Sequence, residues 1–121
     1  MTLARCLLGK QGEALAVGFL KERGFEILHE NYRCRLGEID IIAREGDVLA
    51  FIEVKTRRNE TFGHPAEAVT IAKQKKIIRV AGWYLQEQGV GDQSLRFDVV
   101  SVFCAADPPA LRLFRDAFQV D

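Results

Sequence analysis

Two carboxylates and one lysine stand within apolar segments, where charged side chains are rare. Asp40 lies among isoleucines at positions 39, 41 and 42, and Glu53 and Lys55 follow the apolar run 48–52. Burying a charge costs several kcal/mol unless a partner or a metal ion compensates it. Carboxylates on neighbouring strands can hold a divalent cation through their oxygens. A cation held beside a lysine is chemistry suited to cutting a phosphodiester bond.

Hairpin geometry tests whether these charges converge. A tight connection at Glu45-Gly46 would join the two strands that carry them. In that hairpin Asp40 pairs with Phe51, and it shares a face with Glu53 and Lys55. Glu53 is then the diagonal neighbour of Asp40, about 7–8 Å away at the backbone. A slip of one residue in the register would place the two carboxylates on opposite faces.

Each expected helix carries one polar residue in its apolar stripe. Glu13 lies in the stripe of the first helix, and Gln74 lies in the stripe of the second. Simpler explanations stay open: the helix dipole favours an acid in the first turn, Gln74 can hydrogen-bond a strand end, and Glu53 and Lys55 can form a plain ion pair. One shared site accounts for all five polar groups together.

The whole pattern predicts one α/β domain over residues 1–121, with a mixed central sheet flanked by two helices. No repeat and no linker interrupts the chain. The order is helix, three strands, helix and two strands. The expected elements are a helix over 11–23, strands over 25–32, 38–44 and 48–56, a helix from 65 or 70 to 88, and strands over 95–103 and 111–118.

Composition narrows the classes of function. The chain is 48% apolar and 28% charged, which is ordinary for a soluble globular protein. It has no apolar run of about 20 residues to span a membrane, so we expect a cytoplasmic protein without a membrane partner. Its 17 basic and 17 acidic residues argue against a strongly basic, high-affinity nucleic-acid binder. Its three cysteines, an odd number, argue against a disulfide framework and predict reduced thiols.

These residues resemble the PD-(D/E)XK nuclease superfamily, and more narrowly the YraN-like family of small bacterial proteins related to archaeal Holliday junction resolvases. The resemblance covers most of the chain and implies a restriction-endonuclease-like αβββαβ core. One departure is Ile39, which stands where the superfamily has a proline before its first acid. The matching segments are residues 12–16 (GEALA), 31–42 (NYRCRLGEIDII), 51–57 (FIEVKTR), the helix around 73–76 (KQKK) and 96–100 (RFDVV).

The resemblance implies a metal site formed by Glu13, Asp40, Glu53 and Lys55, and hydrolysis of phosphodiester bonds in DNA, including branched DNA. The three acids would hold Mg²⁺ or Mn²⁺, with the carbonyl of Val54 as a further oxygen ligand. Lys55 would orient or deprotonate the attacking water, or stabilise the developing negative charge. Gln74 would position Lys55 or a phosphate.

Basic residues near the expected site are candidates for contacts with DNA phosphates, which position a substrate without reading its sequence. They are Arg33, Arg35, Arg57 and Lys73. The alternative function is a nucleic-acid-binding module, or a subunit of a repair complex, that keeps the nuclease fold without turnover. Symmetric cutting of a four-way junction would require a homodimer. Residues 83–84 and 111–114 are the candidate interfaces, unless they pack into the protein's own core.

Overall fold

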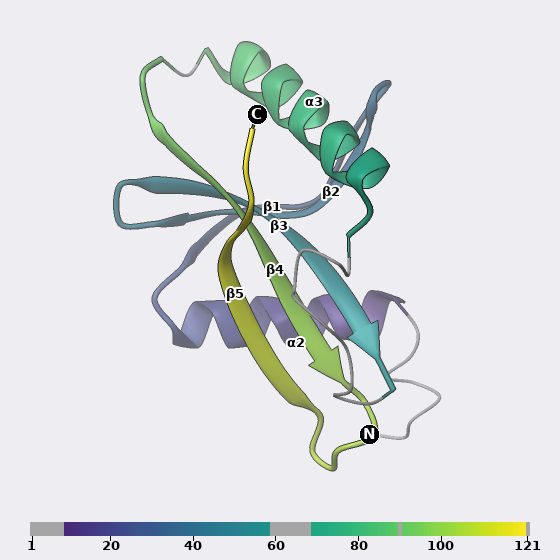
Figure 1. Ribbon diagram of the computed structural model, residues 1–121. Helices are drawn as coiled ribbons and strands as arrows, with labels where there is room; N and C mark the ends of the chain where they lie inside the picture. The colour runs from purple at the N-terminus through teal and green to yellow at the C-terminus, as the bar shows by residue number, and fades with distance from the viewer. Residues whose placement is uncertain (1–8, 59–68, 90, 121) are drawn as a thin grey trace.

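The computed structural model describes residues 9–58, 69–89 and 91–120 (Figure 1). It confirms the predicted order of helices and strands, with boundaries that differ by a few residues. The elements are α2 (Gly9–Glu22), β1 (Glu26–Cys34), β2 (Gly37–Glu45), β3 (Val48–Arg57), α3 (Ile71–Gln88), β4 (Ser94–Phe103) and β5 (Ala110–Phe118).

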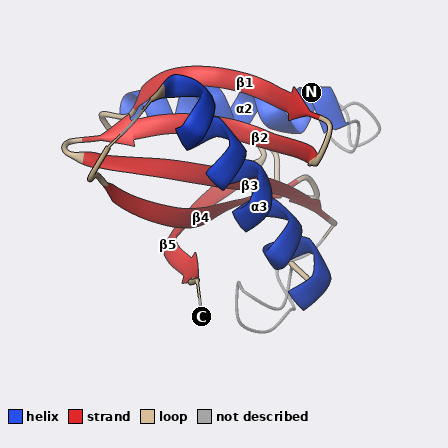
Figure 2. Cartoon of the chain, turned by 90° about the horizontal axis from the view of Figure 1, so that it is seen from above, coloured by secondary structure: helices blue, strands red, loops and turns tan. Residues whose placement is uncertain are grey.

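The five strands form one mixed sheet in the order β1-β2-β3-β4-β5. Strands β3 and β4 are parallel, and the other neighbours are antiparallel. A parallel pair needs a crossover connection, and α3 lies within that connection. Figure 2 shows α2 and α3 on opposite faces of the sheet. The predicted α/β fold, a mixed sheet flanked by two helices, is therefore confirmed.

Each helix packs over its own hydrophobic cluster. The cluster beneath α2 contains Ala16, Val17, Leu20, Ile41, Ile52, Val100 and Val102, among others. The cluster beneath α3 contains Ile39, Ile42, Phe51, Ile77, Val80, Tyr84, Phe97 and Phe118, among others. Phe97 stacks on Phe51 and on Phe118, with ring centroids 5.6 Å and 5.2 Å apart. Burial on both faces explains why the central strands have nearly continuous apolar sequences.

Capping residues set the ends of α3. The side chain of Thr70 accepts a hydrogen bond from the backbone N–H of Lys73 at 3.2 Å. This satisfies one of the N–H groups that a helix start leaves without a partner. Gly89 ends the helix in the left-handed conformation, with φ of 66°, as its sequence position predicts. The helix that Thr70 caps therefore begins at the later of the two predicted starting positions, 65 and 70.

The β2–β3 hairpin differs from its predicted register by two residues. Glu45 pairs with Val48, so the turn is Gly46-Asp47 rather than Glu45-Gly46. Gly46 has a φ of 59°, a conformation that suits the tight turns of hairpins. A shift of two residues keeps each side chain on its predicted face, whereas a shift of one would not. It also moves the position opposite Asp40 from Phe51 to Glu53.

An ion-pair network ties three strands of the sheet together. Asp98 is completely buried, and its carboxylate accepts hydrogen bonds from Arg96 at 2.8 Å and from the backbone N–H of Asp116 at 2.9 Å. Arg96 and Arg115 also bind Glu45, at 2.7 Å and 2.6 Å. The hydrogen bonds from Arg115 and Arg96 lower the pKa of Glu45 to about 2. This network joins β2, β4 and β5 where the β4–β5 register shifts.

Three further expectations concern cysteines, interfaces and membranes. Cys34 is a free thiol but Cys104 is disulfide-bonded, so the expectation of reduced thiols is wrong for Cys104. Tyr84 is only 4% exposed and lies in the core, which removes it from the candidate interface. The 111–114 segment lies on the edge strand β5 and is partly buried against both clusters. No helix in the described part of the chain is long and apolar enough to cross a membrane.

Candidate active site

Asp40 lies at the point where β2 and β3 separate. The pairing between these strands ends at Ile41 and Ile52, the residues next to Asp40 and Glu53. Its Oδ2 accepts a hydrogen bond of 2.8 Å from the backbone N–H of Val54. Ile39 and Ile42 both pack into the cluster beneath α3, so the alternation of side chains is broken at this point of β2. The Asp40 carboxyl therefore lies between the strands, bound to β3 through the main chain.

Two further acids contact Asp40. Its carboxyl hydrogen-bonds those of Glu13, from the first turns of α2, and Glu53, from β3. Burial, together with the hydrogen bond and charge of Glu53, raises the pKa of Asp40 to about 7. Burial and the charge of Asp40 also raise the pKa of Glu13. Asp40 therefore keeps its proton up to near neutral pH when no cation is bound.

The three acids stand close together, but they do not form a ready metal cage. Within residues 9–58, 69–89 and 91–120, no group of three His, Cys, Asp or Glu side chains is arranged so that it could hold a metal ion. Mg²⁺, however, is commonly bound by one or two carboxylates, with water and substrate phosphates completing its six oxygens. Asp40 and Glu53 supply two carboxyls whose mutual repulsion a cation would relieve. The donor set fits such a cation, and metal binding stays a prediction.

Glu53 connects the acids to α3. It is only 8% exposed, and its Oε2 lies 3.7 Å from the ammonium of Lys73 in the first turn of the helix. The pair explains how a carboxylate on the apolar face of β3 is tolerated. Lys73, which the sequence suggested as a phosphate contact, thus lies directly beside the acids.

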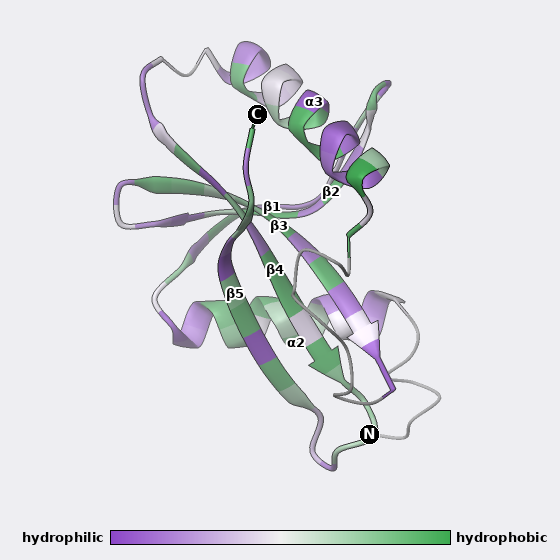
Figure 3. Cartoon of the chain, viewed as in Figure 1, coloured by the Kyte–Doolittle hydropathy of each residue, from purple (hydrophilic) through white to green (hydrophobic). Residues whose placement is uncertain are grey.

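Lys55 lies two residues beyond Glu53 on β3 and is partly buried. Figure 3 shows hydrophilic segments interrupting the apolar strand towards its C-terminal end. Neither a hydrogen bond nor an ion pair joins the Lys55 ammonium to another described residue. In the parallel register it neighbours Ser101, which is completely buried and whose hydroxyl has no hydrogen-bond partner among the described residues. The Lys55 ammonium thus has no ion-pair partner among the described residues.

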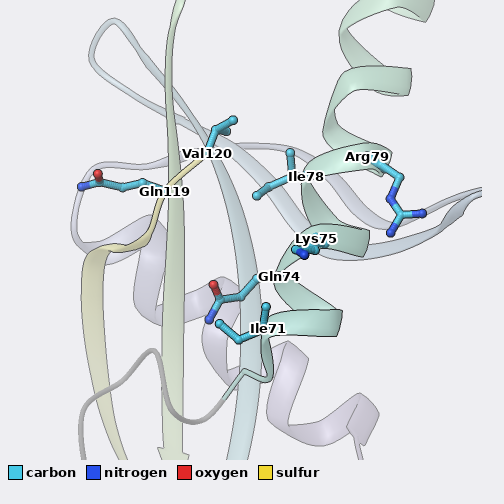
Figure 4. A pocket seen from close by; sticks show the side chains of 7 residues that line it. All are labelled: Ile71, Gln74, Lys75, Ile78, Arg79, Gln119 and Val120. Carbon is cyan, nitrogen blue, oxygen red and sulfur yellow. The ribbon is translucent and has the colours of Figure 1, made fainter.

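Gln74 binds the main chain. Its Nε2 donates a hydrogen bond of 2.9 Å to the carbonyl of Val69, just before α3. The side chain also lines a pocket on the other flank of the helix, with Ile71, Lys75, Ile78, Arg79, Gln119 and Val120 (Figure 4). This arrangement matches the simpler explanation, a hydrogen bond to a segment end. A role in positioning Lys55 or a phosphate stays a prediction.

Asn31 is a site residue that sequence reasoning missed. The β1–β2 register places it opposite Asp40, because its neighbours Glu30 and Tyr32 pair with Ile41 and Ile39. Its φ of 52° is left-handed, and its side chain hydrogen-bonds Glu13. Asparagine adopts this conformation more readily than most residues. The only signal in the sequence was an asparagine within an expected strand.

The four candidate phosphate contacts lie in different places. Arg33 pairs with Glu38 at 3.1 Å and shares a pocket with Lys73. Arg35 lies over the ring of Trp83, 5.3 Å from its centroid. Arg57 ends β3, where its carbonyl accepts a hydrogen bond from the backbone N–H of Cys104. Burial lowers the pKa of the Arg57 guanidinium. The structure thus places Arg33 and Lys73 at one pocket.

Comparison with known proteins shows the family to which the chain belongs. Residues 12–102 match the profile of the uncharacterised protein family UPF0102. The chain is 50% identical over 113 residues to a UPF0102 protein of Caldicellulosiruptor saccharolyticus, covering 92% of this chain and 96% of the relative. A UPF0102 protein of Syntrophotalea carbinolica is 46% identical over 121 residues, covering 100% and 98%. One from Nocardia farcinica is 55% identical over 95 residues, covering 78% and 75%.

Proposed function

We propose that this chain, which belongs to the uncharacterised protein family UPF0102, is a metal-dependent nuclease that hydrolyses phosphodiester bonds in DNA, branched DNA in particular. The observation that carries the proposal is the contact between Asp40 and Glu53 on neighbouring strands, with Lys55 two residues further along β3. A buried pair of acids that repel each other is costly to maintain without a function.

Asp40 and Glu53 would be the main ligands of Mg²⁺ or Mn²⁺, with Glu13 and the carbonyl of Val54 as further oxygen donors. A bound cation of this kind lowers the pKa of a water and neutralises charge on the phosphate. The hydrogen bond from the Val54 N–H fixes one oxygen of Asp40 and would leave the other for the cation. Since the raised pKa of Asp40 keeps its carboxyl protonated up to near neutral pH, metal binding would release that proton.

The lysines of the site would have distinct tasks. Lys55 would orient or deprotonate the attacking water, or stabilise the charge that develops on the phosphate. Lys73 holds Glu53 by an ion pair and would fix the position of this acid beside the cation. Gln74, through its bond to Val69, would fix the entry to α3 and thereby the position of Lys73.

Cleavage of labelled junction and linear duplex DNA tests the proposal. The pure protein is incubated with Mn²⁺, with Mg²⁺ or with EDTA. We expect cleavage only with the divalent ions, and a loss of about 10²-fold or more in Lys55→Ala. Lys75→Ala, an exposed lysine on α3, is the matched control and should cleave normally. Binding of DNA without cleavage under all conditions would favour the alternative, a nucleic-acid-binding module without turnover.

A further inference from the structure

A pocket of about 310 Å³ lies between the β1–β2 turn and the first half of α3. Three of its side chains are basic and one is acidic, although the chain as a whole is neutral. A local excess of positive charge in a concave site attracts anions. We name it the basic pocket, and its lining residues are Arg33, Cys34, Gly37, Glu38, Lys73 and Lys76.

Gly37 allows Lys76 to lie across this pocket. The glycine has a φ of 145°, which side-chain-bearing residues rarely adopt. A Cβ at this position would stand 2.9 Å from Cε of Lys76 and 3.2 Å from Cγ2 of Val80. The aliphatic stem of Lys76 therefore packs directly on the backbone of Gly37. A stem held in this way loses less conformational freedom when its ammonium binds a ligand.

The basic pocket adjoins the candidate active site. Lys73 lines the pocket, and its ammonium lies 3.7 Å from Oε2 of Glu53. The side chains of Arg33 and Glu38, which pair at 3.1 Å, are 74% and 49% exposed. Such an exposed pair contributes little stability, so Arg33 can turn to a ligand at small cost. A chain of phosphates could thus extend from the acids into the pocket.

From this arrangement we infer that the basic pocket binds a backbone phosphate of the DNA strand that is cut, next to the scissile phosphate. The inference rests on the proposed nuclease function. The inference adds Lys76 to the candidate phosphate contacts, and Gly37 is the residue that positions Lys76. Lysine and arginine contacts of this kind set the register of a strand without reading its bases. The basic pocket would therefore select for backbone position rather than for sequence.

The salt dependence of DNA binding tests this role without relying on cleavage. Anisotropy of labelled junction DNA is measured in EDTA at increasing salt for the full chain and for Lys76→Ala. Each phosphate contact contributes about 0.9 to the slope of log K against log salt on duplex DNA. We expect Lys76→Ala to lower the slope by about that amount, and Lys76→Arg to retain it. Lys75→Ala, which removes the neighbouring charge outside the pocket, should leave the slope unchanged.

Gly37→Ala supplies a second test, because it should displace Lys76 without removing its charge. Its slope should fall as in Lys76→Ala, with folding checked by thermal unfolding. If Lys76→Ala keeps the wild-type slope while the wild type cleaves DNA, the basic pocket is refuted and the nuclease function stands. If Lys76→Ala lowers the slope but the wild type does not cleave, the phosphate contact of the basic pocket stands, whereas turnover and the place of this contact beside a scissile phosphate are refuted. A wild type that neither binds nor cleaves DNA overturns both.

Discussion

Replacing Asp40 by asparagine should stabilise the metal-free protein above neutral pH. Asparagine keeps an oxygen for the Val54 N–H but cannot ionise. The pKa of Asp40 is about 7 in the folded protein, against 3.8 for an aspartate without these contacts. Between these values the folded state binds more protons than the unfolded state, so the wild type loses stability as the pH rises. The loss is complete above about pH 7, where Asp40 is ionised in both states.

The magnitude follows from the shift in pKa. The difference between the two values corresponds to an upper bound of about 4 kcal/mol. Because relaxation of the site lowers the cost of ionising Asp40, a smaller gain is expected, roughly 1–3 kcal/mol at about pH 8. At about pH 5 the gain should be smaller, since folded Asp40 is then protonated.

Urea unfolding in EDTA at about pH 5 and about pH 8 measures both values. Asp92→Asn, which changes an exposed acid in the α3–β4 connection, is the control and should show no such dependence. Adding Mn²⁺ should reverse the order at the higher pH, because a ligand at 100 times its Kd stabilises the wild type by about 2.7 kcal/mol. If Asp40→Asn changed stability equally at both pH values, the raised pKa of Asp40 would be refuted.

Three further predictions concern the frame and the assembly. Glu45→Gln should cost stability near neutral pH, because the lowered pKa of Glu45 favours the folded state there. The difference in stability from the wild type should vanish as the pH falls from 4.5 through about 2. Acid unfolding measures this difference, and a difference that stays constant with pH would contradict the prediction. Asp98→Ala should cost roughly 3–5 kcal/mol in urea unfolding, because it leaves the Arg96 guanidinium buried without its carboxylate; a cost below about 1 kcal/mol would show that the network is not structural. Sedimentation with junction DNA should show two chains on one junction, and a single chain would exclude paired incision.

The fold follows from local patterns that the sequence displays openly. Gly24 and Gly89 end the helices, and alternating or continuous apolar runs specify the strands. The hairpin register was harder to predict, because the sequence offers two overlapping two-residue turns, Glu45-Gly46 and Gly46-Asp47. The left-handed Gly46 together with the strand pairing decides between them. The acids still share one region, since the error was an even number of residues.

The contacts of the site depend on tertiary geometry that no local pattern encodes. The approach of Lys73 to Glu53 depends on how α3 crosses the sheet, and the approach of Asn31 to Glu13 depends on a single left-handed residue in β1. Gln74 illustrates the converse case. Its place on the helical wheel suggested a role among the acids, whereas its amide binds the nearby carbonyl of Val69. Short-range hydrogen bonds of this kind compete with any functional assignment.

Calorimetric titration of the metal-free protein with Mn²⁺ tests the central claim most directly, because it needs neither DNA nor turnover. The wild type should bind the ion, more tightly at about pH 8 than at about pH 6, since binding displaces the proton that Asp40 holds at the lower pH. The double variant Asp40→Asn/Glu53→Gln should keep the fold and lose the binding. Binding of Mn²⁺ by the folded double variant with unchanged affinity would contradict the assignment of these two carboxylates as the metal site.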